Sequence, residues 1–113
     1  MFFVPCTICV LRDHEEDCWV ISVPADAVET AAGRLAELHS GVRKRIVFLD
    51  QKTEFVLTAD TVTYHGRCVP ITQNWLECLE KLFTGDIRPG ISHLDWEFSD
   101  RLGNINITVM IAP

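Results

Sequence analysis

The sequence predicts an α+β fold, in which two helices pack on a mainly antiparallel sheet built from hairpins. Several short runs alternate apolar and polar residues, as half-buried strands do. Two longer segments instead repeat apolar residues at helical spacing. Strands grouped in hairpins around these segments favour α+β over alternating parallel units. The expected order is ββα-βββ-α-ββ, in one domain over residues 1–113 because a chain of 113 residues is one domain by length.

The first part of the chain predicts a hairpin followed by a helix. Residues 3–11 and 18–23 are rich in apolar and β-branched side chains and flank the polar turn 12–17, as two paired strands do. The period changes after Pro24. The residues that then fall on one helical face are Val28, Ala31, Ala32, Leu35 and Leu38. Gly41 supplies the signal that ends this helix.

Short strands are expected between the two helices. Residues 45–49 form an apolar run without polar alternation, which favours a strand covered on both faces. Residues 54–59 form another strand. The segments 61–65 and 67–71 flank His65 and Gly66, which predict a tight turn because glycine tolerates a positive φ.

The second helix is expected over residues 73–84. Thr72 is a favourable N-cap residue, and Gly85 follows the last turn. Two adjacent apolar ridges give this helix a wide stripe that predicts extensive burial. Their members are Leu76, Leu79 and Phe83 on one ridge and Trp75, Cys78 and Leu82 on the other.

The last part of the chain predicts the clearest hairpin. Residues 93–99 alternate strictly between apolar and polar. After a turn at 101–103, Ile105, Ile107, Val109 and Ile111 alternate with Asn104, Asn106, Thr108 and Met110. One face of this hairpin is therefore expected to be exposed to solvent. Trp96 belongs to the apolar set and is expected in the core.

Composition excludes some classes of function. The chain has 16 acidic and 10 basic residues, a net charge of −6. Nucleic-acid binding is therefore not expected, because it requires a basic surface that releases counterions. The acidity is compatible with a basic protein partner. A hydrophobic fraction of 48% also predicts a partly apolar exposed face, so a homodimer is an alternative assembly.

The cysteine count and the apolar beginning of the chain bear on its compartment. Five cysteines, an odd number, without a secretory signal favour reduced thiols in the cytoplasm. Residues 1–11 are apolar but too short to span a bilayer, so no membrane association is expected.

Cys6 and Cys9 have the spacing of a C-x-x-C motif. Such pairs hold zinc or perform redox chemistry at a knuckle or a helix N-terminus. Here the pair lies in an apolar β run, where residues three apart point to opposite faces. We interpret these cysteines as core residues, and we expect Cys68 and Cys78 to be buried as well.

Two charged clusters are candidate binding residues. The segment 13–17 has neither a calcium-loop pattern nor a zinc-helix pattern, so it is either a recognition loop or a solvated turn. On the last hairpin, three polar side chains share one strand face at a spacing of about 7 Å. The predicted partner-binding residues are Asp13, Glu15, Glu16, Asp17, His93, Asp95 and Glu97.

The leading hypothesis is a small acidic protein-binding module, most concretely an inhibitor or immunity-type protein that covers a basic toxin or enzyme. No nucleophile elbow, P-loop or dinucleotide fingerprint occurs, so we expect no enzymatic activity, cofactor or metal. One alternative is a small enzyme or a ligand- or metal-binding protein that uses His93, Asp95 and Glu97, joined by His65. Another is a structural homodimeric subunit.

Overall fold

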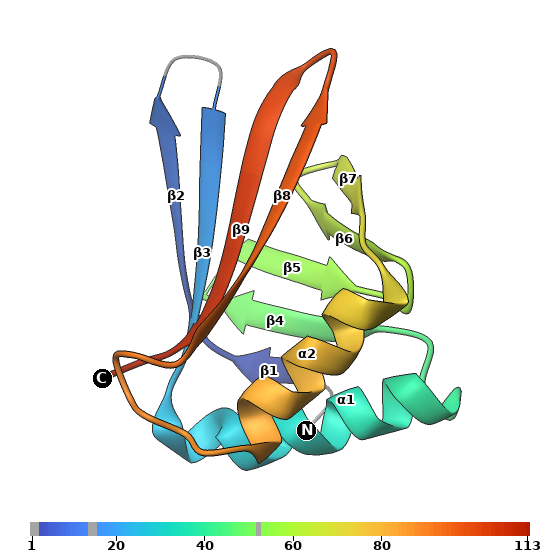
Figure 1. Cartoon of the computed structure of the whole chain (residues 1–113), viewed down its shortest axis with the longest axis vertical. Helices are drawn as coiled ribbons and strands as arrows, with labels where there is room; N and C mark the ends of the chain where they lie inside the picture. Colours follow the sequence, from blue (N-terminus) through green and yellow to red (C-terminus); the bar gives the residue numbers. More distant parts are fainter. Residues whose placement is uncertain (1–2, 14–15, 52) are drawn as a thin grey trace.

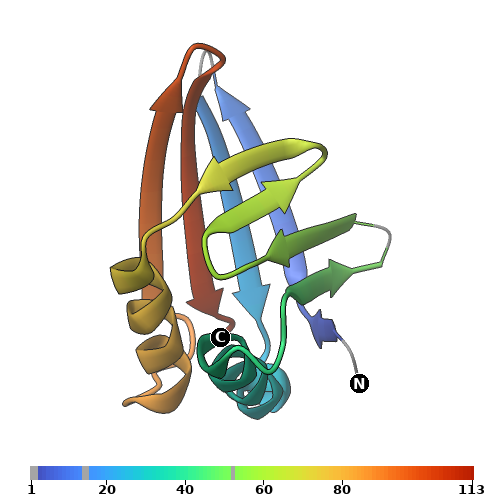
Figure 2. The same cartoon turned by 90° about the vertical axis from the view of Figure 1, so that its right-hand side faces the viewer.

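In the computed structural model, which describes residues 3–13, 16–51 and 53–113, nine strands form two sheets and two α-helices pack beside them (Figure 1). The predicted α+β fold class is therefore confirmed. Figure 2 shows that the five-stranded sheet crosses in front of the four-stranded sheet, with both helices at the lower end. Among the described residues, no helix has the length and apolarity that a membrane crossing requires.

The five-stranded sheet has the order β1-β4-β5-β6-β7. Its strands are β1 (Phe3–Pro5), β4 (Ile46–Asp50), β5 (Thr53–Leu57), β6 (Thr61–Tyr64) and β7 (Arg67–Pro70). β1 pairs in parallel with β4, whereas the other pairs are antiparallel. His65 and Gly66 connect β6 to β7 with φ angles of 48° and 76°, and two positive φ angles are what a type I′ hairpin turn requires.

The four-stranded sheet has the order β2-β3-β9-β8. Its strands are β2 (Thr7–Asp13), β3 (Glu16–Val23), β9 (Gly103–Ile111) and β8 (His93–Asp100). The two predicted hairpins, β2–β3 and β8–β9, are both present. A parallel pairing of β3 with β9 joins them into one sheet.

The two helices have the predicted positions. A short 3₁₀ turn, Ala25–Ala27, leads into α1 (Val28–Ser40), which ends at Gly41 with a left-handed φ of 83°. α2 (Gln73–Thr84) begins after Thr72, whose hydroxyl oxygen accepts a hydrogen bond of 3.0 Å from the N–H of Trp75. This bond satisfies one of the free donors of the first turn.

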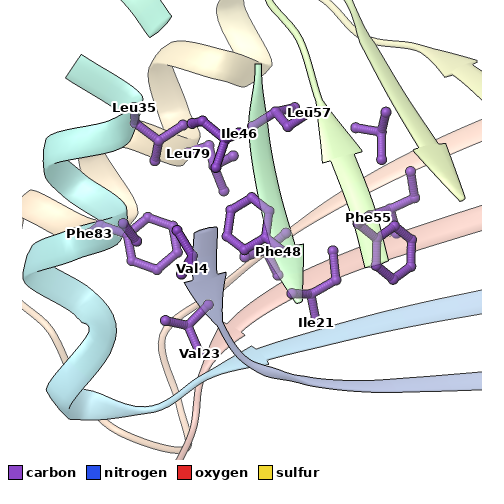
Figure 3. Packing of buried hydrophobic residues seen from close by; sticks show 14 of the residues in the cluster. Val4, Ile21, Val23, Leu35, Ile46, Phe48, Phe55, Leu57, Leu79 and Phe83 are labelled. Carbon is purple, nitrogen blue, oxygen red and sulfur yellow. The ribbon is translucent and has the colours of Figure 1, made fainter. Parts of the chain in front are cut away.

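The core lies between the facing sides of the two sheets and against both helices (Figure 3). The helix residues in it are Val28, Ala31, Leu35 and Leu38 of α1 and Trp75, Leu76, Leu79 and Phe83 of α2. The largest fully buried strand residues include Phe48 of β4, Phe55 of β5 and Ile107 of β9. Every member of this cluster is apolar, so burial of apolar surface is its main source of stability.

The first predicted strand is divided in two. Pro5 has no N–H to donate, and β1 ends there. The N–H of Cys6 then donates to the carbonyl oxygen of Leu49 at 3.1 Å, and the N–H of Ile8 donates to Oδ2 of Asp50 at 2.9 Å. The chain thus leaves one sheet and enters the other within a single apolar run. Between α1 and α2 the structure has four strands, β4 to β7, instead of the three in the expected order.

The expected burial of the cysteines is wrong in part. Cys9 and Cys68 are exposed, and the other three cysteines are half-buried. An apolar run in a strand faces both sides of its sheet, and these two thiols occupy outward positions. Trp96 is half-buried and packs against the core, so its predicted direction is confirmed but its side chain stays partly accessible.

Candidate functional site

The side chains of the four-stranded sheet divide between two faces. The inward positions of β3 and β9 are buried, among them Trp19, Ile21, Ile107 and Val109. We call the opposite side the outer face. Its described positions are Thr7, Cys9, Leu11, Glu16, Cys18, Val20, Ser22, His93, Asp95, Glu97, Ser99, Asn104, Asn106, Thr108 and Met110. None of these side chains is buried, so the rest of the described chain leaves this face open.

An apolar block occupies the β2–β3 half of the outer face. Cys9 lies opposite Val20, and Leu11 lies opposite Cys18. Leu11, on the edge strand β2, is 59% exposed, a high value for a large apolar side chain. Met110 of β9 extends the block toward β8. This arrangement leaves apolar surface in contact with water, a feature that marks interaction sites.

Carboxylates border the apolar block on two sides. Asp95 and Glu97 lie across the sheet on β8, and Glu16 lies at the start of β3. All three are exposed, and none of the outer-face positions carries a lysine or arginine. The negative charge of this face is therefore not balanced within the face itself.

Asp95 is held in place by two neighbours. Its Oδ1 accepts a hydrogen bond of 2.6 Å from the hydroxyl of Thr108, and its Oδ2 lies 3.7 Å from Nε2 of His93. Nδ1 of His93 in turn lies 2.8 Å from the carbonyl oxygen of Ile91. The carboxylate is thus oriented by strand neighbours and remains exposed to a partner.

The predicted cluster 13–17 is split between the faces. Glu16 joins Asp95 and Glu97 on the outer face, whereas Asp17 faces inward. Asp17 accepts hydrogen bonds from Nε and Nη2 of Arg12 at 2.8 and 3.3 Å. The side chain of Asp13 and the whole of Glu15 lie outside the described residues.

The residues of the alternative catalytic or metal site do not converge. His93, Asp95 and Glu97 follow one another along β8, and His65 lies on the other side of the four-stranded sheet, beside Trp19. In the part of the chain that the structure describes, no group of three or more histidine, cysteine or carboxylate side chains has a metal-binding arrangement.

Cys6 and Cys9 do not form a reactive pair. Burial, together with the negative charge of Asp50, raises the pKa of the Cys6 thiol to about 12. Redox and metal-binding cysteines need a lowered pKa, because the thiolate is the reactive form. Cys9, in contrast, is an exposed member of the outer face.

Sequence reasoning missed the β2 and β3 members of the outer face. Cys9, Leu11, Cys18 and Val20 lie in apolar runs, which indicated burial and not an open surface. Only the pairing of β3 with β9 places them beside the carboxylates of β8. Comparisons with protein family models, curated proteins and solved structures found no match to this chain.

Proposed function

We propose that this chain is a protein-binding module that covers a basic protein with the outer face of its four-stranded sheet, as an inhibitor or immunity-type protein would. The observation that carries the proposal is an open sheet face with an apolar block, three carboxylates and no lysine or arginine at its described positions. An apolar centre with a polar rim is the usual anatomy of a protein interface.

The two parts of the face have different physical roles. The apolar block, with Leu11 at its most exposed point, would contribute affinity through desolvation. Carboxylates at the rim would mainly accelerate encounter with a basic partner and exclude acidic ones. The net charge of −6 acts in the same direction at longer range.

Charge reversal on the outer face tests the proposal. The double variant Asp95→Lys with Glu97→Lys should lose the basic protein that the unmodified chain retains stoichiometrically from a lysate of its source organism. The loss should be larger at low ionic strength than at high, because salt screens exposed charges. Capture is measured by pull-down and native mass spectrometry over a salt series.

The matched control is Glu54→Lys with Glu77→Lys, which changes the net charge equally at exposed positions of β5 and α2. This control should retain the partner, and both double variants should unfold near the temperature of the unmodified chain. If both double variants lost the partner equally, the loss would be due to the net charge of the chain and not to the outer face. Capture of no basic protein, or full capture by the outer-face variant, would contradict the proposal.

A homodimer is a second candidate, favoured by the exposed side of the five-stranded sheet. An uninterrupted row crosses all five strands there through Phe3, Val47, Val56, Thr63 and Cys68. None of these side chains is charged and none is buried, so the row offers apolar surface to a second copy. Self-association through it would shield Cys68 from alkylating reagents as the protein concentration rises.

A further inference from the structure

A cleft of about 380 Å³ lies on the other side of the four-stranded sheet from the outer face. Its lining residues come from β2, β3 and the β6–β7 hairpin. Figure 2 shows this hairpin crossing those strands. Its wall residues include Arg12, Asp17, Trp19, Tyr64, His65 and Arg67. This volume is in the range of sites that hold small molecules.

Aromatic rings form one wall of the cleft. Tyr64 stacks on Phe55 with ring centroids 4.4 Å apart and meets Trp19 edge-on at 5.3 Å. The ring of His65 lies 4.3 Å from that of Tyr64. Because Phe55 and Trp19 are buried, this wall is held rigidly from behind. The Tyr64 ring lies between those of Phe55 and His65, so the imidazole of His65 is the outer ring of this wall and offers its face to a planar group.

The position of the His65 ring depends on an uncommon backbone conformation. Its φ of 48° is in the left-handed region, which glycine adopts more easily than histidine. The type I′ turn with Gly66 imposes this conformation. This backbone and the ring contact with Tyr64 together place the imidazole at the cleft.

Hydrogen-bond donors without partners point to what the cleft accepts. The indole N–H groups of Trp75 and Trp96 donate to backbone carbonyl oxygens at 3.0 and 2.9 Å. The indole N–H of Trp19 and the hydroxyl of Tyr64 have no hydrogen bond to any described residue. A nearly buried tryptophan usually satisfies its N–H, so this donor is free for a ligand at the cleft.

The two arginines add further donors. Nε and Nη2 of Arg12 donate to Asp17, and Nη2 of Arg67 donates to Oδ1 of Asp100 at 2.6 Å. Each guanidinium carries five N–H groups, so both keep free donors. Asp17, the carboxylate in the wall, already accepts on both oxygens.

The charge balance selects the kind of acceptor. Each guanidinium is paired with one aspartate, so the cleft has many donors but little excess positive charge. A doubly charged phosphate would add two uncompensated negative charges there, whereas a carboxylate adds only one. A carboxylate carries one negative charge, and its two oxygens match the planar donors of a guanidinium.

We propose that this cleft binds a small aromatic monocarboxylate. The ring of the ligand packs on the imidazole of His65, and its carboxylate accepts hydrogen bonds from Trp19 and from the free N–H groups of Arg12 and Arg67. This site is independent of the outer face, so the failure of either proposal leaves the other standing.

The three tryptophans provide the test. In a ¹H–¹⁵N correlation spectrum each indole N–H gives its own signal, assigned with Trp75→Phe and Trp96→Phe. Addition of 3-phenylpropionate should shift the Trp19 signal to saturation and leave those of Trp75 and Trp96 unchanged. The uncharged 3-phenylpropionamide should bind about tenfold more weakly, because its carbonyl oxygen carries no negative charge and forms no ion pair with the arginines. Inorganic phosphate should not displace 3-phenylpropionate.

Variants locate the site. Arg12→Gln should weaken binding of 3-phenylpropionate about tenfold without unfolding the chain, since Arg12 is 76% exposed in its ion pair with Asp17. His65→Asn keeps a residue that tolerates the left-handed backbone and should also weaken binding. The matched control is Arg88→Gln, because Arg88 has an exposed pair with Asp86 at 3.4 Å but does not line the cleft.

Three results would overturn the proposal. The first is no saturable shift of the Trp19 signal up to about 10 mM 3-phenylpropionate. The second is equal binding of the acid and the amide. The third is an equal loss of affinity in Arg12→Gln and Arg88→Gln.

Discussion

Trp75→Ala is expected to lower the free energy of unfolding by about 3–5 kcal/mol. The side chain is 4% exposed and packs with its ring centroid 6.2 Å from that of Trp96. Its indole N–H also donates to the carbonyl oxygen of Asp95 on β8. The variant would create a cavity and remove the partner of that oxygen, two effects that add. Urea unfolding followed by circular dichroism measures the loss.

Trp96→Ala is the matched control for this prediction. Trp96 has an equivalent hydrogen bond, to the carbonyl oxygen of Pro70, but its side chain is only half-buried. Its replacement should therefore cost clearly less, because less apolar surface returns to water. If Trp96→Ala cost as much as Trp75→Ala, the two side chains would not differ in burial as the structure shows.

Phe55→Ala is expected to have a similar effect, again about 3–5 kcal/mol. Phe55 is completely buried in β5 and lies between the two sheets. Its ring centroid is 5.3 Å from that of Trp19 and 4.4 Å from that of Tyr64, so the variant removes two aromatic contacts as well as volume. The loss is measured by the same urea titration.

The neighbouring residue supplies the control. Val56 points to the other side of β5 and is half-buried, so Val56→Ala should cost no more than about 1 kcal/mol. A larger cost for Val56→Ala than for Phe55→Ala would mean that the register of β5 is shifted by one residue. Such a shift would exchange the two sides of the strand.

Elements that depend on local sequence were predictable. The second helix has its N-cap residue, its apolar stripe and its final glycine within fourteen consecutive residues, and its predicted bounds agree with Gln73–Thr84. The β8–β9 hairpin shows its alternation just as locally, and its exposed face is confirmed.

The division of the strands between two sheets depends on contacts that are distant in sequence. β3 pairs with β9 across more than eighty residues, and nothing in either segment specifies that partner. The change of sheet at Cys6 is similar, because it depends on hydrogen bonds to Leu49 and Asp50. Pro5 was the one local sign that the first strand ends early.

The candidate site was predictable to the same extent. Strict alternation placed Asp95 and Glu97 on one face, and the structure confirms it. The segment 12–17 was expected to be a turn, so no alternation was applied to it. In the structure β3 begins at Glu16. Because successive strand residues point to opposite faces, Glu16 lies on the outer face and Asp17 on the inner one.

Alkylation of Cys9 and Cys68 in the complex tests the central proposal most directly. Both thiols are exposed, Cys9 on the outer face and Cys68 on the five-stranded sheet. If a basic partner covers the outer face, iodoacetamide should modify Cys9 much more slowly in the complex than in the free chain, and Cys68 at an unchanged rate. An unchanged rate at Cys9 in the complex would contradict the assignment of this face as the binding surface.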